Sequence, residues 1–187
     1  MLLRIAALVV LAGCPSTPPD ACTPPQQGSG LGDTNGADAE LVAVDASGNL
    51  VTLHDGDPVP LLGAPQGGHI LLVGARIHEA DECSLDATGA LRDTGTQRVL
   101  GLDSRAMYME PTGDGFSQPQ NSLAAMPNVA VCPTSATTAA VNGQPYQLEL
   151  TASAMGTTIV DLKVMVTPAC AADDSYCAQD CGPQGSF

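Results

Sequence analysis

The sequence has no tryptophan, and its other aromatic side chains are three tyrosines and two phenylalanines among 187 residues. Sugar-binding β domains commonly stack tryptophan and tyrosine rings against the faces of their ligands. This chain lacks the rings that such a platform needs. We therefore expect no carbohydrate ligand.

Basic residues are also scarce, with six Lys and Arg against 20 Asp and Glu and a formal net charge of −14. Proteins that bind nucleic acid need a basic patch to meet the phosphate backbone. The basic residues after Arg4 are scattered along the chain, at Arg76, Arg92, Arg98, Arg105 and Lys163. We expect no nucleic-acid partner, and we interpret the acidic balance as an aid to solubility.

Several sequence motifs of metal and catalytic sites are missing. No CxxC pair occurs, which argues against zinc, iron–sulfur and thioredoxin-like redox sites. The segment HEADE at His78 resembles the start of a zincin motif, but Glu82 stands where the second histidine belongs. No G-x-S-x-G elbow surrounds Ser117. We predict no catalytic residue, no enzyme activity and no cofactor.

A copper site is one alternative that the residue types permit. It would combine His54, His69 and His78 with Met107 and Met109 of the segment MYME. Methionines that alternate along a strand, however, usually point to one face and fill a core. We favour packing over metal binding for these residues.

The chain has one strongly apolar stretch, IAALVVLA at residues 5–12, with Arg4 before it and small residues after it. This is the layout of a secretory signal. A membrane-crossing helix needs about 20 apolar residues, and Pro15 and Pro18 would end a helix soon after this stretch. We predict that residues 1–13 are a signal peptide and are removed.

The segment LAGC at residues 11–14 resembles the lipobox of bacterial lipoproteins at all four positions. The resemblance implies a diacylglycerol on the thiol of Cys14, cleavage before Cys14 and acylation of the new amino group. Several acyl chains hold a protein on a membrane durably. Pro15, in place of an aspartate that would favour inner-membrane retention, implies the outer membrane of a bacterial cell envelope. The face of that membrane stays open.

The count of cysteines agrees with a lipidated Cys14. The chain has seven cysteines, an odd number, and assigning Cys14 to lipid leaves six: Cys22, Cys83, Cys132, Cys170, Cys177 and Cys181. Six cysteines can pair completely, in any of 15 ways. Exported proteins generally form disulfides. We therefore predict three bridges.

Composition divides the mature chain into three parts. Residues 14–38 comprise the lipidated cysteine and a tether of mainly Pro, Gly, Ser, Thr, Asp and Gln, which we predict to be flexible. Residues 39–170 form the folded domain, and residues 171–187 form a polar, cysteine-containing tail. About 130 residues can bury a single core.

Short apolar or alternating runs, separated by Gly, Asp and Asn, predict an all-β domain. In the segment 146–154, Tyr146, Leu148 and Leu150 alternate with polar residues, as in a strand with one wet face. This segment and 158–168 should form a hairpin. The other expected strands are 40–45, 49–54, 69–78, 97–103, 106–110 and 128–132, and turns are expected at 46–49 and 87–90.

The segment NGQPYQLEL followed by IVDLKVMVTP resembles the last two strands of immunoglobulin-like sandwiches on bacterial surfaces. The resemblance implies an immunoglobulin-like β-sandwich, with Tyr146 as a corner tyrosine whose hydroxyl ties a loop to the strand. The Cys…Trp…Cys spacing of antibody domains is absent. A small β-barrel is the alternative.

Calcium is the ligand with the most candidate residues. Hard oxygen donors lie in glycine-containing loops at Asp33, Asn35 and Asp38, at Asp45 and Asn49, and at Asp55 and Asp57. None of these segments completes the twelve-residue EF-hand pattern. The same residue types also form ordinary turns.

The positions of the cysteines suggest a pairing. Cys83 and Cys132 both lie within the strand-rich body, and we predict a bridge between them. We predict that Cys22 and the three tail cysteines form the other two bridges. Altogether the sequence predicts a lipid-anchored envelope protein with a non-catalytic β domain that binds or scaffolds another envelope protein. A calcium-binding or adhesion module is the first alternative, and an envelope enzyme is the second.

Overall fold

The computed structural model describes residues 39–78, 80, 84–133 and 140–182. This part of the chain folds into eleven strands and one short helix. The elements in chain order are β1 (Ala39–Val44), β2 (Leu50–Thr52), β3 (Asp57–Pro60), β4 (Leu62–Gly63), β5 (His69–His78), β6 (Ser84–Arg92), β7 (Val99–Pro111), β8 (Phe116–Pro119), β9 (Asn128–Cys132), β10 (Tyr146–Ala154), β11 (Thr157–Ala169) and α1 (Ser175–Cys181).

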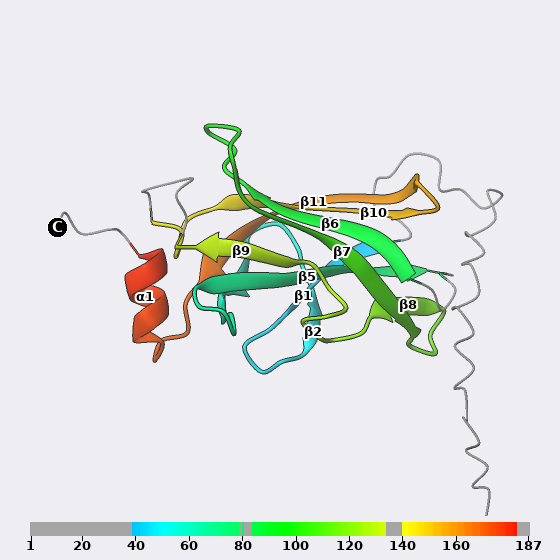
Figure 1. Ribbon diagram of the computed structural model, residues 1–187, viewed down its shortest axis with the longest axis horizontal. Helices are drawn as coiled ribbons and strands as arrows, with labels where there is room; N and C mark the ends of the chain where they lie inside the picture. Colours follow the sequence, from blue (N-terminus) through cyan, green and yellow to red (C-terminus); the bar gives the residue numbers. More distant parts are fainter. Residues whose placement is uncertain (1–38, 79, 81–83, 134–139, 183–187) are drawn as a thin grey trace, which may run out of the picture.

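The strands pair in the order β2-β1-β5-β8-β7-β6-β10-β11-β3, and β4 and β9 both pair with β5. The sheet folds over on itself, so that β6, β10 and β11 lie above β1, β5 and β9 with the core between them (Figure 1). The strand β7 links the layers, because Val99–Tyr108 pairs with β6 and Met109–Pro111 with β8. An all-β, sandwich-like fold is thus confirmed. The described strands form an open sheet and not the closed barrel of the alternative prediction.

Strand β5 is central, and its first seven residues are all buried. Its first half pairs with β4 and β9, and its second half with β1 and β8. Leu71 and Val73 face the main core, while Ile70 and Leu72 face a smaller cluster around Met126. Both faces are covered, which explains why this segment is continuously apolar and not alternating.

The predicted hairpin is confirmed. β10 and β11 pair antiparallel around a turn at Met155 and Gly156, and buried residues alternate along β10 as the sequence indicated. The hydroxyl of Tyr146 donates to the backbone carbonyl of Ala140, six residues earlier, at 3.3 Å. Tyr146 therefore ties a loop to its strand, as the immunoglobulin-like resemblance implied.

The turn predicted at residues 87–90 is wrong, because these residues lie in the middle of β6. Gly89 accounts for the error. A Cβ at this position would lie 2.7 Å from Val73 Cγ2 and 2.9 Å from Val129 Cγ2. Glycine is therefore needed here for the close approach of β6 to its neighbours, and not for a turn. The turn predicted at 46–49 is correct and joins β1 to β2.

Other differences concern short or edge elements. The two strands expected at 97–103 and 106–110 are one continuous strand, β7. Strands β3, β4 and β8 were not predicted. Pro58 and Pro60 argue against a strand at β3, but β3 pairs only with β11 and is an edge strand, where proline is tolerated.

The polar tail forms the helix α1, which was not predicted. Asp174 caps its N-terminus by accepting a hydrogen bond from the backbone N–H of Cys177 at 2.9 Å. The helix packs at one end of the layers, beside β5 and β9 (Figure 1). Within the described ranges, no helix has the length and apolar character needed to cross a membrane.

Candidate functional site

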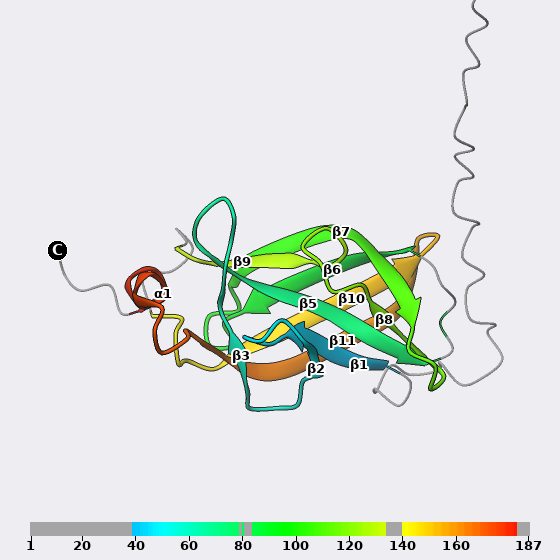
Figure 2. The same cartoon turned by 90° about the horizontal axis from the view of Figure 1, so that it is seen from below.

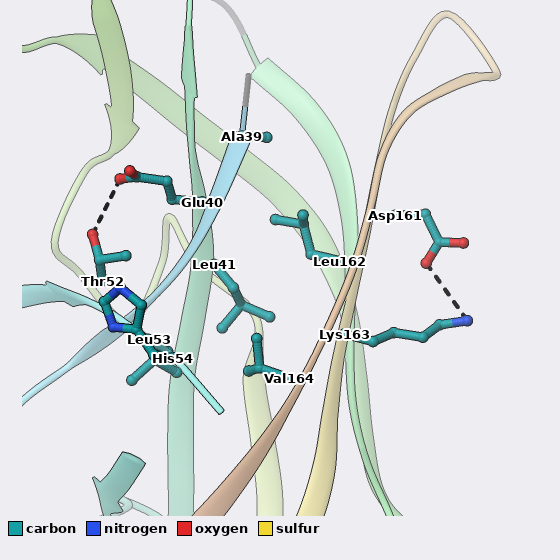
Figure 3. Close-up of a pocket in the computed structure, with 10 residues that line it drawn as sticks. All are labelled: Ala39, Glu40, Leu41, Thr52, Leu53, His54, Asp161, Leu162, Lys163 and Val164. Carbon is teal, nitrogen blue, oxygen red and sulfur yellow. Dashed lines mark hydrogen bonds and ion pairs between the residues drawn. The ribbon is translucent and has the colours of Figure 1, made fainter. Parts of the chain in front are cut away.

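A groove separates β1 from β11, which lie side by side without pairing (Figure 2). It has a volume of about 540 Å³, within the roughly 300–1,000 Å³ usual for ligand pockets. Three short segments line it: Ala39, Glu40 and Leu41; Thr52, Leu53 and His54; and Asp161, Leu162, Lys163 and Val164 (Figure 3). We call it the β1–β11 groove.

One wall of the groove is a free edge of β11. Strand β3 pairs with β11 only from Val166 onward. At Met165 the backbone N–H donates to Asp55 and the carbonyl accepts from Gly56, so the backbone of Met165 points away from β10. Backbone direction alternates along a strand, and the β10–β11 register is regular here. The N–H and C=O groups of Asp161 and Lys163 therefore face the groove.

The opposite wall is the first part of β1. Strand β2 pairs with β1 only at residues 42–44. The carbonyl of Leu41 accepts from the N–H of Leu53. The backbone groups of the odd-numbered residues in β1 therefore point away from β5. The backbone of Ala39 points the same way, into the groove. Among the described residues, no backbone partner meets Ala39, Asp161 or Lys163 on this side.

The floor of the groove is apolar. Leu41 is buried, while Leu162 and Val164 are half-buried and point toward β1 (Figure 3). The side chains of Asp161 and Lys163 point away from β1 (Figure 3). Lys163 Nζ lies 3.8 Å from Asp161 Oδ1. These two residues thus contribute backbone groups to the groove.

The polar rim carries charges of both signs, from Glu40, Asp161 and Lys163. The carboxylate of Glu40 accepts hydrogen bonds from Thr52 Oγ1 at 3.2 Å and from Arg76 Nη1 at 3.0 Å. His54 Nδ1 lies 3.4 Å from a carboxylate oxygen of Asp57. The groove therefore combines an apolar floor, unpaired backbone groups and a charged rim, which can bind a ligand with both apolar and amide groups.

A second cluster surrounds His69, whose side chain is only 5% exposed. Its Nε2 lies 3.4 Å from Asp174 Oδ2, and its Nδ1 lies 3.6 Å from Asp180 Oδ2. The backbone N–H of Cys177 chiefly, and the His69 ring in addition, lower the pKa of Asp174. His69 therefore sits between two carboxylates, one at the N-cap of α1 and one in its last turn.

Two disulfides lie against His69, and they correct the predicted pairing. Cys132 bonds to Cys181 and Cys170 bonds to Cys177, with Cα–Cα distances of 5.2 and 5.6 Å. The predicted bridge from Cys83 to Cys132 is therefore wrong, as is the grouping of Cys22 with all three tail cysteines. Cys22 and Cys83 themselves lie outside the described residues.

The physical reason for the correction is α1. Residues four apart in a helix share a face, and Cys177 and Cys181 are both buried with their sulfurs 3.8 Å apart. The helix thereby brings Cys181 to the end of β9, where Cys132 lies. Thiol ligands for a metal would be close together here, but these sulfurs are oxidised, and the metal ligand is a thiolate.

The loop acids considered for calcium have other partners. Asp45 Oδ1 accepts from the backbone N–H groups of Ser47 and Asn49, both at 2.8 Å. Asp57 accepts from the N–H of His54, and Asp55 from that of Met165. Those carboxylates hold turns and strand ends in place. The candidates Asp33, Asn35 and Asp38 lie outside the described residues.

The residues considered for catalysis or copper have structural contacts. Ser117 is 2% exposed and donates to the carbonyl of Ala80 at 2.6 Å. His78 packs edge-on against Phe116. Met107 and Met109 are both buried, as packing on a single face predicted.

The groove was not predicted from the sequence. The alternation at Leu162 and Val164 was visible, but alternation does not tell which edge of a strand is left unpaired. Comparisons with models of protein families, with curated proteins and with solved structures found no match to this chain.

Proposed function

We propose that this chain is an exported lipoprotein, anchored through Cys14, whose β domain binds another component of a bacterial cell envelope. The observation that carries the proposal is the segment LAGC at the end of the apolar run. It has the leucine, the small pair and the cysteine that lipoprotein processing requires.

The disulfides support the export part of the proposal. Four of the six cysteines other than Cys14 are joined in two bridges within the described residues. Structural disulfides are typical of oxidising compartments and rare in the cytosol. A lipidated Cys14 also removes the seventh cysteine, which would otherwise be an unpaired thiol.

The tether supports anchorage at a distance from the lipid. Residues 15–38 contain one large apolar residue, Leu31, so this segment offers little surface for a core. A flexible chain of this length spans about 27 Å on average. The domain could therefore reach partners beyond the lipid headgroups. By the same lipobox rule, Pro15 favours the outer membrane.

Binding, and not catalysis, is the activity that the described residues favour. The β1–β11 groove offers an apolar floor and unpaired backbone groups. Ser117, considered for catalysis, and His69 and His78, considered for copper, are engaged in structural contacts.

The anchor is tested by replacing Cys14→Ser in the full chain and expressing it in a diderm bacterium. We expect the wild type to partition into the detergent phase and to incorporate labelled fatty acid. The Cys14→Ser variant should lose both properties, because the acylated thiol is gone. Ser16→Ala, two residues away, is the matched control and should behave as wild type. Detergent partitioning unchanged by Cys14→Ser would refute the anchor.

A further inference from the structure

We propose that the β1–β11 groove binds an extended segment of a partner polypeptide, which adds as a strand to the free edge of β11. The inference deepens the proposed binding function and rests on it for the location of the partner in the envelope. The geometry of the groove is independent of where the chain is anchored.

The unpaired backbone groups define the kind of ligand. Asp161 and Lys163 each present an N–H and a C=O to the groove, two residues apart on one strand edge. Another extended backbone has donors and acceptors at the same spacing, which is the basis of strand addition. Ala39 lines the opposite wall, but β1 comes too close to β11 for a strand to pair fully with both, so the added strand bonds to the edge of β11.

The floor of the groove determines which side chains the partner segment needs. In an added strand, every second side chain points to the same face as Leu162 and Val164. Both residues are half-buried and pack against the main core. An aliphatic side chain placed over them would extend that core. The partner segment therefore needs β-branched or other aliphatic residues at alternating positions.

Charge defines the flanks of the segment. The chain carries a net charge of −14, which outweighs the local basic groups Lys163 and Arg76, and Glu40 lines the groove. Lysine or arginine beside the apolar positions would be attracted to this surface, and the attraction would weaken with salt. The expected ligand is an aliphatic strand with basic ends.

Two other occupants fit less well. The tether at 15–38 has Leu31 as its one large apolar residue, and cannot supply alternating aliphatic side chains. The free edge of β11 faces β1 of the same molecule. A rigid edge strand from a second folded copy would have to pass β1, whereas a flexible single segment can enter the groove directly.

The probe is a fluorescein-labelled peptide, Lys-Val-Thr-Val-Thr-Val-Lys, titrated by anisotropy against the full chain with its disulfides intact. The valines would face Leu162, and the threonine backbones would pair with Asp161 and Lys163. We expect saturable binding below about 100 μM, weakening as salt is raised. The same peptide with both threonines N-methylated lacks the donors that face β11, and should bind at least about tenfold more weakly.

Two variants separate the backbone of β11 from a general loss of positive charge. Lys163→Pro removes an N–H that faces the groove and leaves the β10 pairing intact, and proline is tolerated at a strand edge. We expect at least about tenfold weaker binding for Lys163→Pro. Arg98→Ala removes a positive charge at an exposed residue that does not line the groove, and should stay within about threefold of wild type.

Three results would overturn the inference: no binding by wild type at 1 mM peptide (about the weakest affinity of interest), equal binding of the N-methylated peptide, or equal binding by folded Lys163→Pro. If Lys163→Pro does not fold, the N-methylated peptide alone decides. Sedimentation of the unliganded chain as a dimer that Lys163→Pro dissociates would instead assign the edge to a second copy. None of these results depends on Cys14, so failure here leaves the anchor proposal standing.

Discussion

Single residues decide how closely the strands of this domain approach one another. A Cβ at Gly101, in β7, would overlap the backbone carbonyl oxygen of Ala130 in β9. A backbone atom cannot rotate away as a side chain does. The position therefore admits only glycine while β7 and β9 keep their present spacing.

The prediction for Gly101→Ala is a loss of about 3 kcal/mol in the free energy of unfolding, the upper end of the usual cost of overpacking, because β9 must move. The measurement is urea unfolding of the oxidised protein. Gly63→Ala is the control, since a Cβ there meets nothing within 4 Å, and it should change stability little. Equal stability of the two variants would show that β7 and β9 are not so close.

Several carboxyl groups make the fold sensitive to acid. Hydrogen bonds lower the pKa of Asp45, chiefly from the N–H of Asn49, and of Asp93, chiefly from the side chain of Thr96. In the unfolded chain an aspartate titrates near pH 3.9. Because the folded pKa is lower, these groups stabilise the fold above that pH, and the contribution is lost as pH falls through the folded pKa.

We therefore predict that Asp93→Asn destabilises the protein at pH 6 and has a smaller effect at pH 2.5. The variant cannot lose a charge that acid already removes from the wild type. Urea midpoints at the two pH values measure the difference. A gap between wild type and variant that grows on acidification would mean that the direction of the pKa shift is wrong.

Among the secondary-structure elements, long strands with strong alternation or continuous apolar residues could be predicted from the sequence. This holds for β5 and for the β10–β11 hairpin, with their boundaries close to those observed. Local pattern is sufficient there because one or both faces are buried. The helix α1 has little apolar surface of its own and depends on its cap and on two disulfides, which no local pattern reveals.

The candidate site was harder to predict than the fold. The groove exists because β2 and β3 end before they cover the edges of β1 and β11. Such an ending depends on which distant strands pair, and the residues Leu162 and Val164 look the same in a paired and an unpaired strand. The loop acids could be recognised in the sequence as candidate calcium ligands. In the structure, their hydrogen bonds to their own turns account for their positions.

The two disulfides should contribute unequally to stability. Cys132 and Cys181 are 49 residues apart, and Cys170 and Cys177 are 7 apart. Loop entropy gives about 4 kcal/mol for the longer loop and about 2.5 kcal/mol for the shorter one. We predict that replacing Cys132 and Cys181 together by Ala lowers Tm more than replacing Cys170 and Cys177. The reverse order would mean that strain or contacts at α1 outweigh loop length.

At the scale of the whole molecule, the cysteines, the acidic composition and the tether agree with the proposed export and lipid anchorage. Two disulfides join the tail to the folded domain, and Cys22 and Cys83 are left as the remaining pair if Cys14 carries lipid. The proposal for the groove adds a means of holding another polypeptide at the membrane.

The central claim is that the mature chain begins with a lipidated Cys14. Mass spectrometry of the N-terminal peptide tests it most directly, after digestion of the membrane-extracted protein with a protease that cuts before aspartate and so before Asp20. We predict a peptide of residues 14–19 with diacylglycerol on the sulfur and a blocked or free α-amino group, and no peptide from residues 1–13. A peptide with an unbroken bond between Gly13 and Cys14 and an unmodified thiol would contradict the account.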